Sequence, residues 1–301
     1  MHFTFIRLAN LHSDFISAII FLQDLKNRRG EINNMLQSYA SDSTFKMNQP
    51  FFKDNAFDYH EIHVDKPYQA VFYEFITSYS CASGISCVPS GCLDIMFVTD
   101  IDEPFMMFVG SPTEIKTVRG CPNSRYFGVR LKPGMHLAYQ NLPLRDLTNT
   151  EIVLNSTNAQ VKSFFAKLKK THTLEQRILL FHQFFDPSVE TGSSAELTQQ
   201  MLVDINSARG GIHIAELAEK LNYSERHLSR IFQDTMGMSP KTFARIVRFQ
   251  NVIDIILSSA PQHMSDFFID LGYSDQAHFQ REFKQYAGMT PKSFIQYIMH
   301  G

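Results

Sequence analysis

The spacing of apolar positions divides the chain into stretches with helical and with strand-like periodicity. Apolar residues recur every three or four positions over 13–40, which predicts one or two helices. Over 59–131 the pattern changes to short β-prone runs separated by glycine, proline and asparagine turns, as in a β-barrel or sandwich. Helical spacing returns over 158–186 and again over 195–301. We therefore expect an α+β amino-terminal domain with flanking helices, followed by an all-α carboxyl-terminal domain.

A loss of periodicity marks the expected domain boundary. Residues 187–194 read Pro-Ser-Val-Glu-Thr-Gly-Ser-Ser, a composition typical of a linker. The sequence thus predicts one domain at 1–186, with a helical extension at 1–46, and a second domain at 195–301. A length of 301 residues fits two domains of ordinary size.

One sequence unit occurs twice in the last third of the chain. Leu-Asn-Tyr-Ser at 221–224 returns as Leu-Gly-Tyr-Ser at 271–274, and Gly-Met-Ser-Pro-Lys at 237–241 returns as Gly-Met-Thr-Pro-Lys at 288–292. The two leucines are 50 residues apart, whereas the histidines that follow, at 227 and 278, are 51 apart. We expect one inserted residue near Ala277. A unit repeated in this way predicts one supersecondary structure built twice.

Each copy predicts two short helices joined by a tight turn. In the first copy, residues 214–221 have an apolar inner face, and Ser224 is a natural N-cap for the helix that follows. Gly237 supplies the left-handed stop that ends this second helix. In the second copy either Ser274 or Asp275 can take the capping position. The predicted unit is a helix-turn-helix.

The outward side of the second helix in each copy carries arginine and other polar residues, which suits DNA recognition. Such a helix has the dimensions to enter a major groove, where arginine can bridge two guanine acceptors. Residues 243–257 are long enough to form one helix that holds the two motifs at a fixed separation. The alternative is a helical protein-interaction module whose surface arginines are only solvated. The shared cap, glycine stop and Pro-Lys restart favour DNA binding.

Residues 205–298 resemble the tandem helix-turn-helix domain of the AraC/XylS family of bacterial transcription regulators. The second copy, which begins Gly-Tyr-Ser-Asp at 272–275, is similar to the signature of that family. The resemblance implies that the second helix of each motif enters successive major grooves. It implies base-reading roles for Arg226, Ser229, Arg230, Gln276, Ala277, Gln280 and Arg281. It implies contacts to the DNA backbone from Ser224, Lys241, Arg248, Lys284 and Lys292.

The same resemblance implies a regulator that binds specific DNA sequences, and it favours an activator that works beside RNA polymerase. Domains before the DNA-binding domain usually bind an effector or dimerise in this family. Residues 59–185 resemble an uncharacterised sensor-type domain found in some members, and this likeness names no ligand. The expected partners are double-stranded DNA and RNA polymerase, with either a small-molecule effector in a lined barrel or a homodimer built on a filled one. Because Ala277 is short, we expect the first motif to supply most of the base discrimination.

Composition and charge neither support nor exclude a DNA-binding regulator. A net charge of −2 argues neither for nor against DNA, since binding depends on where the cations lie. The beginning of the chain lacks the features of a secretory signal, and its most apolar run, 15–22, is too short to span a bilayer. Four cysteines do not form a disulfide scaffold in a chain of this size, so a cytoplasmic location and no membrane partner are expected.

Three patterns that would suggest a metal site or an enzyme are incomplete. The cysteines Cys81, Cys87, Cys92 and Cys121 lack the close pairs of a zinc site. A zinc-cysteine DNA-repair regulator is the related alternative, but its cysteine spacing and alkyltransferase motif are missing. His-Glu-Ile-His at 60–63 is one residue short of the metalloprotease motif, and no phosphate-binding loop or Ser-His-Asp signature stands out. We expect no metal, no cofactor and no enzymatic activity.

Overall fold

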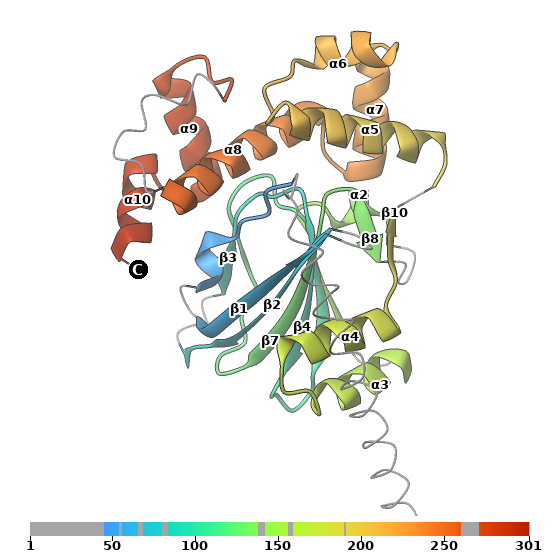
Figure 1. The fold of residues 1–301 in the computed structure, drawn as a ribbon, viewed down its shortest axis with the longest axis vertical. Coiled ribbons are helices and arrows are strands. Elements are labelled where there is room, and N and C mark those ends of the chain that lie inside the picture. The colour runs from blue at the N-terminus through green and yellow to red at the C-terminus, as the bar shows by residue number, and fades with distance from the viewer. Residues whose placement is uncertain are drawn as a thin grey trace, which may run out of the picture.

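The computed structural model in Figure 1 describes most of the chain. The described ranges are 45–53, 56–65, 69–79, 84–137, 142–155, 159–189, 191–259 and 271–300. All but the last two residues of the predicted helical extension at 1–46 lie outside these ranges, as does Cys81. Below, residues 45–189 are called the amino-terminal part and residues 191–300 the helical part.

A six-stranded antiparallel sheet forms the centre of the amino-terminal part, with strand order β1-β2-β7-β4-β5-β9. Two antiparallel ribbons, β3 with β6 and β8 with β10, accompany it. The strands are β1 (Ala56–Val64), β2 (Ala70–Thr77), β3 (Ile85–Cys87), β4 (Leu93–Thr99), β5 (Phe105–Val109), β6 (Lys116–Val118), β7 (Arg125–Leu131), β8 (Met135–Leu137), β9 (Glu151–Asn155) and β10 (Pro187–Val189). The β-rich character predicted for the amino-terminal part is confirmed.

Both faces of this sheet are covered. Helices α3 (Ala159–Leu168) and α4 (Leu174–Phe184) pack on one face, where the rings of Phe97 and Phe164 have centroids 4.6 Å apart. The other face holds a second apolar cluster that includes Phe52, from the short helix η1 (Pro50–Lys53). The inner strand β4 is therefore buried along its whole length, whereas the edge strand β1 is largely exposed or half-buried.

The helical part contains the predicted tandem motif. Figure 1 shows α8 running from the α6–α7 pair to the α9–α10 pair. The helices are α5 (Ser193–Ser207), α6 (Ile214–Leu221), α7 (Glu225–Met236), α8 (Pro240–Ser259), α9 (Gln276–Ala287) and α10 (Pro291–His300). The α+β and all-α division of the predicted fold class is therefore confirmed.

The inserted residue of the second copy lies in the turn, and the expectation that it lies near Ala277 is wrong. Ser224 caps α7 by accepting the backbone N–H of His227 at 3.2 Å, and Asp275 caps α9 by accepting that of His278 at 2.7 Å. These two caps are already 51 residues apart. Since the preceding left-handed residues, at 222 and 272, are 50 apart, the turn before α9 is one residue longer.

The segment predicted as a linker has structure of its own. Its first three residues form β10, which pairs with β8, and α5 begins before its end. The division at 187–194 stays a prediction, because one apolar cluster runs across it.

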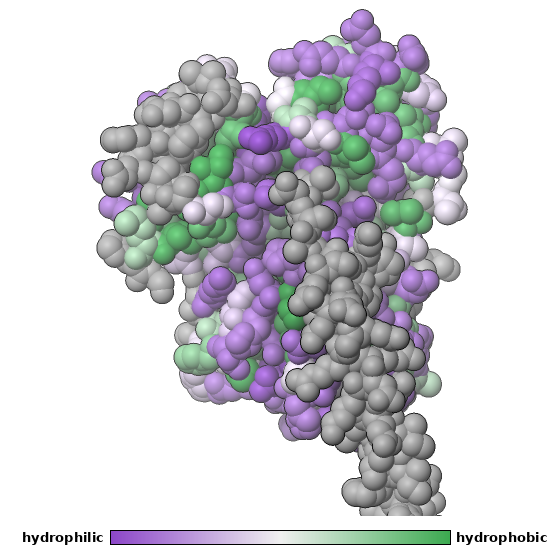
Figure 2. All heavy atoms as spheres, in the orientation of Figure 1, coloured by the Kyte–Doolittle hydropathy of each residue, from purple (hydrophilic) through white to green (hydrophobic). Residues whose placement is uncertain are grey.

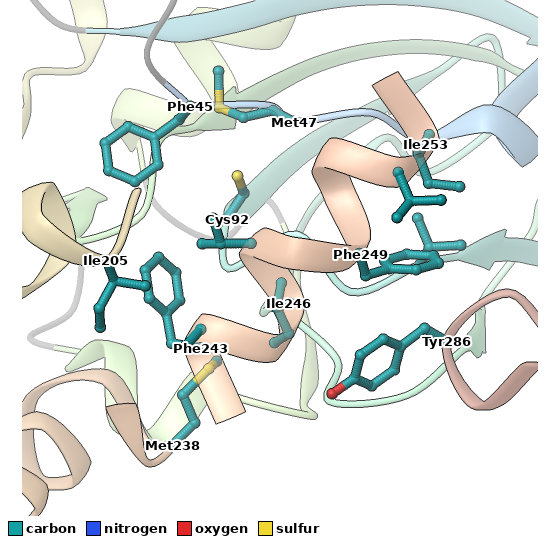
Figure 3. Packing of buried hydrophobic residues seen from close by; sticks show 14 of the residues in the cluster. Phe45, Met47, Cys92, Ile205, Met238, Phe243, Ile246, Phe249, Ile253 and Tyr286 are labelled. Carbon is teal, nitrogen blue, oxygen red and sulfur yellow. The ribbon is translucent and has the colours of Figure 1, made fainter. Parts of the chain in front are cut away.

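Figure 3 shows this cluster, in which Phe45, Met47 and Cys92 of the amino-terminal part lie against Phe243 and neighbouring residues of α8. The contact is close at Gly91, where the backbone has φ +74° and a Cβ would lie 2.6 Å from the Phe243 ring.

Candidate nucleic-acid interface

The second helix of the first motif, α7, turns an apolar face inward and a polar face outward. Leu228, Ile231 and Phe232 are buried, whereas Arg226 and Arg230 are exposed and Ser229 is half-buried. This face follows from the helical spacing of its apolar residues. In the view of Figure 2 the surface over α5 to α7 is mostly hydrophilic.

The second helix of the second motif, α9, has the same design. Phe279 and Phe283 are buried, and their rings pack edge to face. Its predicted reading residues are all exposed: Gln276, Ala277, Gln280 and Arg281. Both polar faces are thus available to a large ligand, and their contacts to bases stay a prediction.

Both of these helices begin at one cleft, of about 670 Å³, between the two motifs. Glu225, the first residue of α7, and Ser274, beside the N-cap of α9, both line it. Lys241 lines the same cleft from α8 and is exposed. Because the amino-terminal end of a recognition helix is the end that reaches base edges in helix-turn-helix proteins, this arrangement suits one DNA duplex bound by both motifs.

The predicted backbone contacts divide into two groups. Lys241, Lys284 and Lys292 are exposed, and their contacts to phosphate stay predictions. Ser224 is exposed as well, although its hydroxyl caps α7. The Arg248 side chain is only 13% exposed. Its Nη1 donates to the Gly272 carbonyl at 2.5 Å, and its guanidinium lies over the Tyr273 ring, 4.8 Å from the centroid.

Arg248 therefore holds the turn of the second motif against α8. Its side chain is engaged inside the helical part, and the phosphate contact expected at this position stays a prediction.

A buried carboxylate, Glu282, joins α9 to α8 and was not found from the sequence. Its side chain is 1% exposed, and Arg245 Nε donates to its Oε2 at 2.6 Å. Arg248 Nε and His278 Nε2 lie 3.8 and 3.7 Å from its carboxylate oxygens. Burial acts to lower the pKa of Arg245, but the hydrogen bond and charge of Glu282 raise it overall.

One sequence signal could have identified this cluster. Glu282 occupies the position that Ile231 holds in the first copy, so a charged residue stands on the inward face of an amphipathic helix. Buried charges are found with partners, and here the partners come from the connecting helix.

The amino-terminal part touches the carboxyl ends of both α7 and α9. Near helix α2 (Leu144–Leu147), Thr148 Oγ1 donates to the Met236 carbonyl at 2.8 Å. The Ile115 N–H donates to the Gln285 carbonyl at 3.5 Å. A cavity of about 540 Å³ lies between the two parts, lined among others by Glu61 of β1, Leu257 of α8 and Ile298 of α10.

The cysteine and histidine patterns form no metal centre within the ranges that the structure describes, where no three His, Cys, Asp or Glu residues are placed to hold an ion. Cys87 and Cys92 are buried and Cys121 is half-buried, all as free thiols. Burial raises the pKa of Cys92 to about 12, which makes this thiol a poor ligand and nucleophile. No described helix is long and apolar enough to span a bilayer.

Comparison with known proteins places the similarity in the helical part. A helix-turn-helix domain family matches residues 217–297. The probable transcription factor PqrA of Proteus vulgaris is 37% identical over 86 residues, which cover 28% of this chain and 68% of PqrA. An uncharacterised HTH-type transcriptional regulator of Haemophilus influenzae is 31% identical over 98 residues, so the chain matches only a third of that relative's length.

Solved structures of ToxT from Vibrio cholerae give weaker matches. One covers 76% of this chain and 94% of ToxT, with 11% sequence identity and a TM-score of 0.40.

Proposed function

This chain belongs to the AraC/XylS family of helix-turn-helix transcription regulators, and on that premise we propose that it binds specific DNA sequences and regulates transcription. The observation that carries the proposal is that α7 and α9 both begin at one cleft and both turn a polar face to solvent. Two such helices held by one connecting helix can occupy successive major grooves on one side of a duplex.

The proposed roles of the two motifs in base recognition follow from side-chain chemistry. Arg226 and Arg230 offer bidentate donors to guanine, whereas the glutamines of the second motif suit adenine. Ser229 and Arg281 complete the proposed reading set, in which Ala277 offers only a methyl group. We therefore propose that base discrimination is stronger in the first half-site.

Phosphate contacts would supply most of the affinity. Three exposed cations are the proposed phosphate contacts: Lys241 of α8, Lys284 in the last turn of α9, and Lys292 of α10. Each phosphate that a cation neutralises releases counterions, which adds affinity that falls as salt rises and is the same for every sequence.

A binding assay across a salt series tests DNA binding against the alternative of a protein-interaction module. The full chain is titrated into a labelled random duplex between roughly 50 and 200 mM salt, and fluorescence anisotropy reports the affinity. Three phosphate contacts predict a loss on the order of 40-fold over this range. Absent or salt-insensitive binding would contradict the proposal. Where binding is observed, selection from a random pool supplies the specific duplex for the later experiments.

We propose activation through RNA polymerase as the finer function, on the ground of family membership alone. The test is transcription in vitro from a promoter with the selected duplex placed upstream. An increase in transcript on adding the full chain supports activation, and a decrease identifies a repressor.

The contacts between the two parts support a proposal about control. Thr148 and Ile115 reach the carboxyl ends of α7 and α9, so a shift of the amino-terminal part would change how the two helices are spaced. A small-molecule effector in the 540 Å³ cavity, or a second copy of the chain, could bias that arrangement by binding one state more tightly.

Substitutions at Leu257 test the cavity as the effector site. Leu257→Phe fills the space beside α8 and imitates an occupant, and Leu257→Ala enlarges it. We expect the DNA affinities of these two variants to differ. Equal affinities for the selected duplex would contradict this part of the proposal.

A further inference from the structure

The two motifs differ in where they place the tyrosine of their turns. Tyr223 is 48% exposed, and its ring stacks on that of His227, with centroids 4.9 Å apart and planes inclined by 11°. Tyr273 is 3% exposed, meets His278 edge to face, and lies under the guanidinium of Arg248. The two motifs therefore differ at the amino-terminal end of their second helices, which is the end that would face DNA.

The length of the turn explains the difference. In the first motif Tyr223 directly precedes the N-cap Ser224, whereas in the second motif Ser274 stands between Tyr273 and the N-cap Asp275. The additional residue allows the second tyrosine to turn back beneath α8. Without it, the Tyr223 side chain is directed outward beside the first turn of α7.

His227 gives the exposed ring a fixed orientation. It is the third residue of α7, its backbone N–H is held by Ser224 at 3.2 Å, and its imidazole lies parallel to the phenol. A stacked pair loses less freedom on binding than a lone surface side chain, because its rotamers are already restricted. The pair lies next to Arg226, the first proposed reading residue of this helix.

We propose that Tyr223 donates its phenolic O–H to a phosphate oxygen of the first half-site, with His227 as the platform that holds the ring. This inference rests on the proposed DNA binding and adds a contact point to it. Tyrosine, like serine and backbone N–H groups, is a common donor to the DNA backbone. A neutral donor releases no counterion, so this contact would add affinity without adding salt dependence.

The competing interpretation is an ordinary exposed tyrosine, since large side chains are often partly exposed on protein surfaces. Tyr79 is 81% exposed in the amino-terminal part and provides a matched control. Its removal tests whether loss of any surface phenol affects the measured affinity.

The experiment compares Tyr223→Phe and Tyr79→Phe in the full chain, each titrated with the selected and the random duplex across the salt series. We expect Tyr223→Phe to weaken both duplexes by about five-fold, with an unchanged slope of affinity against salt. Tyr79→Phe should bind as the wild type does. Thermal unfolding should be the same for all three proteins, because both tyrosines are exposed and their rings are kept.

Three outcomes would overturn the inference. Unchanged affinity in Tyr223→Phe refutes the contact while DNA binding itself stands. A loss confined to the selected duplex assigns the tyrosine to a base and refutes the phosphate contact. Wild-type protein that binds neither duplex refutes the proposed function and this inference with it.

Discussion

Asn48 and Gln250, which are 202 residues apart, exchange two hydrogen bonds: the Asn48 N–H donates to Gln250 Oε1 at 2.8 Å, and Gln250 Nε2 donates to the Asn48 carbonyl at 3.2 Å. The same Nε2 donates to the Pro89 carbonyl at 2.7 Å. On the other side of this segment, Arg130 Nη1 of β7 donates to the Met47 carbonyl at 3.0 Å.

The chain around Met47 and Asn48 is thus fixed between the sheet and α8. Arg130 is itself held by a buried ion pair in which its Nη2 lies 2.9 Å from Oδ1 of Asp94. Through these bonds the orientation of the connecting helix depends on the amino-terminal part, and with it the spacing of the two motifs.

Gln250→Ala should lower the free energy of unfolding by about 1–3 kcal/mol. Gln250 is 2% exposed, and its loss leaves the Asn48 N–H and two carbonyl groups with unmet hydrogen bonds in the apolar cluster between the parts. Denaturant unfolding measures the change. Gln296→Ala, at an exposed position of α10, is the matched control and should leave stability as it is. Equal midpoints for the two variants would show that this contact adds no stability.

Glu282→Ala should destabilise the protein by roughly 3–5 kcal/mol, because it leaves the cations of Arg245 and Arg248 without their buried partner. The loss should fall on the second motif, so base preference in the second half-site should relax first. Urea unfolding and binding to half-site variants measure the two effects. Glu219→Ala, at an exposed position of α6, serves as the control. A Glu282→Ala protein with wild-type stability would show that the ion pairs of Glu282 add no stability.

Arg230→Ala should cost about 1–3 kcal/mol of binding free energy on the selected duplex and relax base preference in the first half-site. Lys292→Ala is the comparison, since a phosphate contact weakens all sequences alike and reduces the salt slope by about one. Anisotropy titrations with selected and random duplexes separate the two. If both variants lose the same affinity on both duplexes, the assignment of reading positions is wrong.

The stability of the amino-terminal part should fall as the pH is lowered through the ordinary range of histidine. Burial lowers the pKa of His182, which packs against Phe72, although the charge of Asp186 acts to raise it. The unfolded chain therefore takes up this proton at a higher pH than the folded chain does. The contribution of His182 to the free energy of unfolding is complete above a pH of about 6.5 and is lost as the pH falls below it.

The measurement is the free energy of unfolding from about pH 7.5 to about pH 5 in the wild type and in His182→Gln. The variant should depend less on pH over this range. His172→Gln, at an exposed position, should keep the wild-type dependence. A slope that is identical in all three proteins would contradict the assignment to His182.

The helical part can be predicted from the amino-acid sequence, because the signals there are local. N-caps, glycine stops and apolar spacing act within a few residues, so α6, α7 and α9 and the polar faces of the last two could be predicted from neighbouring letters. The position of the inserted residue could not, since Ser274 and Asp275 are equally good caps by composition and only the turn geometry selects the second.

Which polar residues face inward depends on how the helices pack against one another. Arg226 and Arg248 have the same chemistry, yet one lies in solvent and the other holds the Gly272 turn, because that turn packs against α8. The bonds between Asn48 and Gln250 likewise join two segments whose sequence patterns do not predict that they meet. Local preferences build each helix, whereas the pairing of distant polar groups depends on which surfaces meet and exclude water.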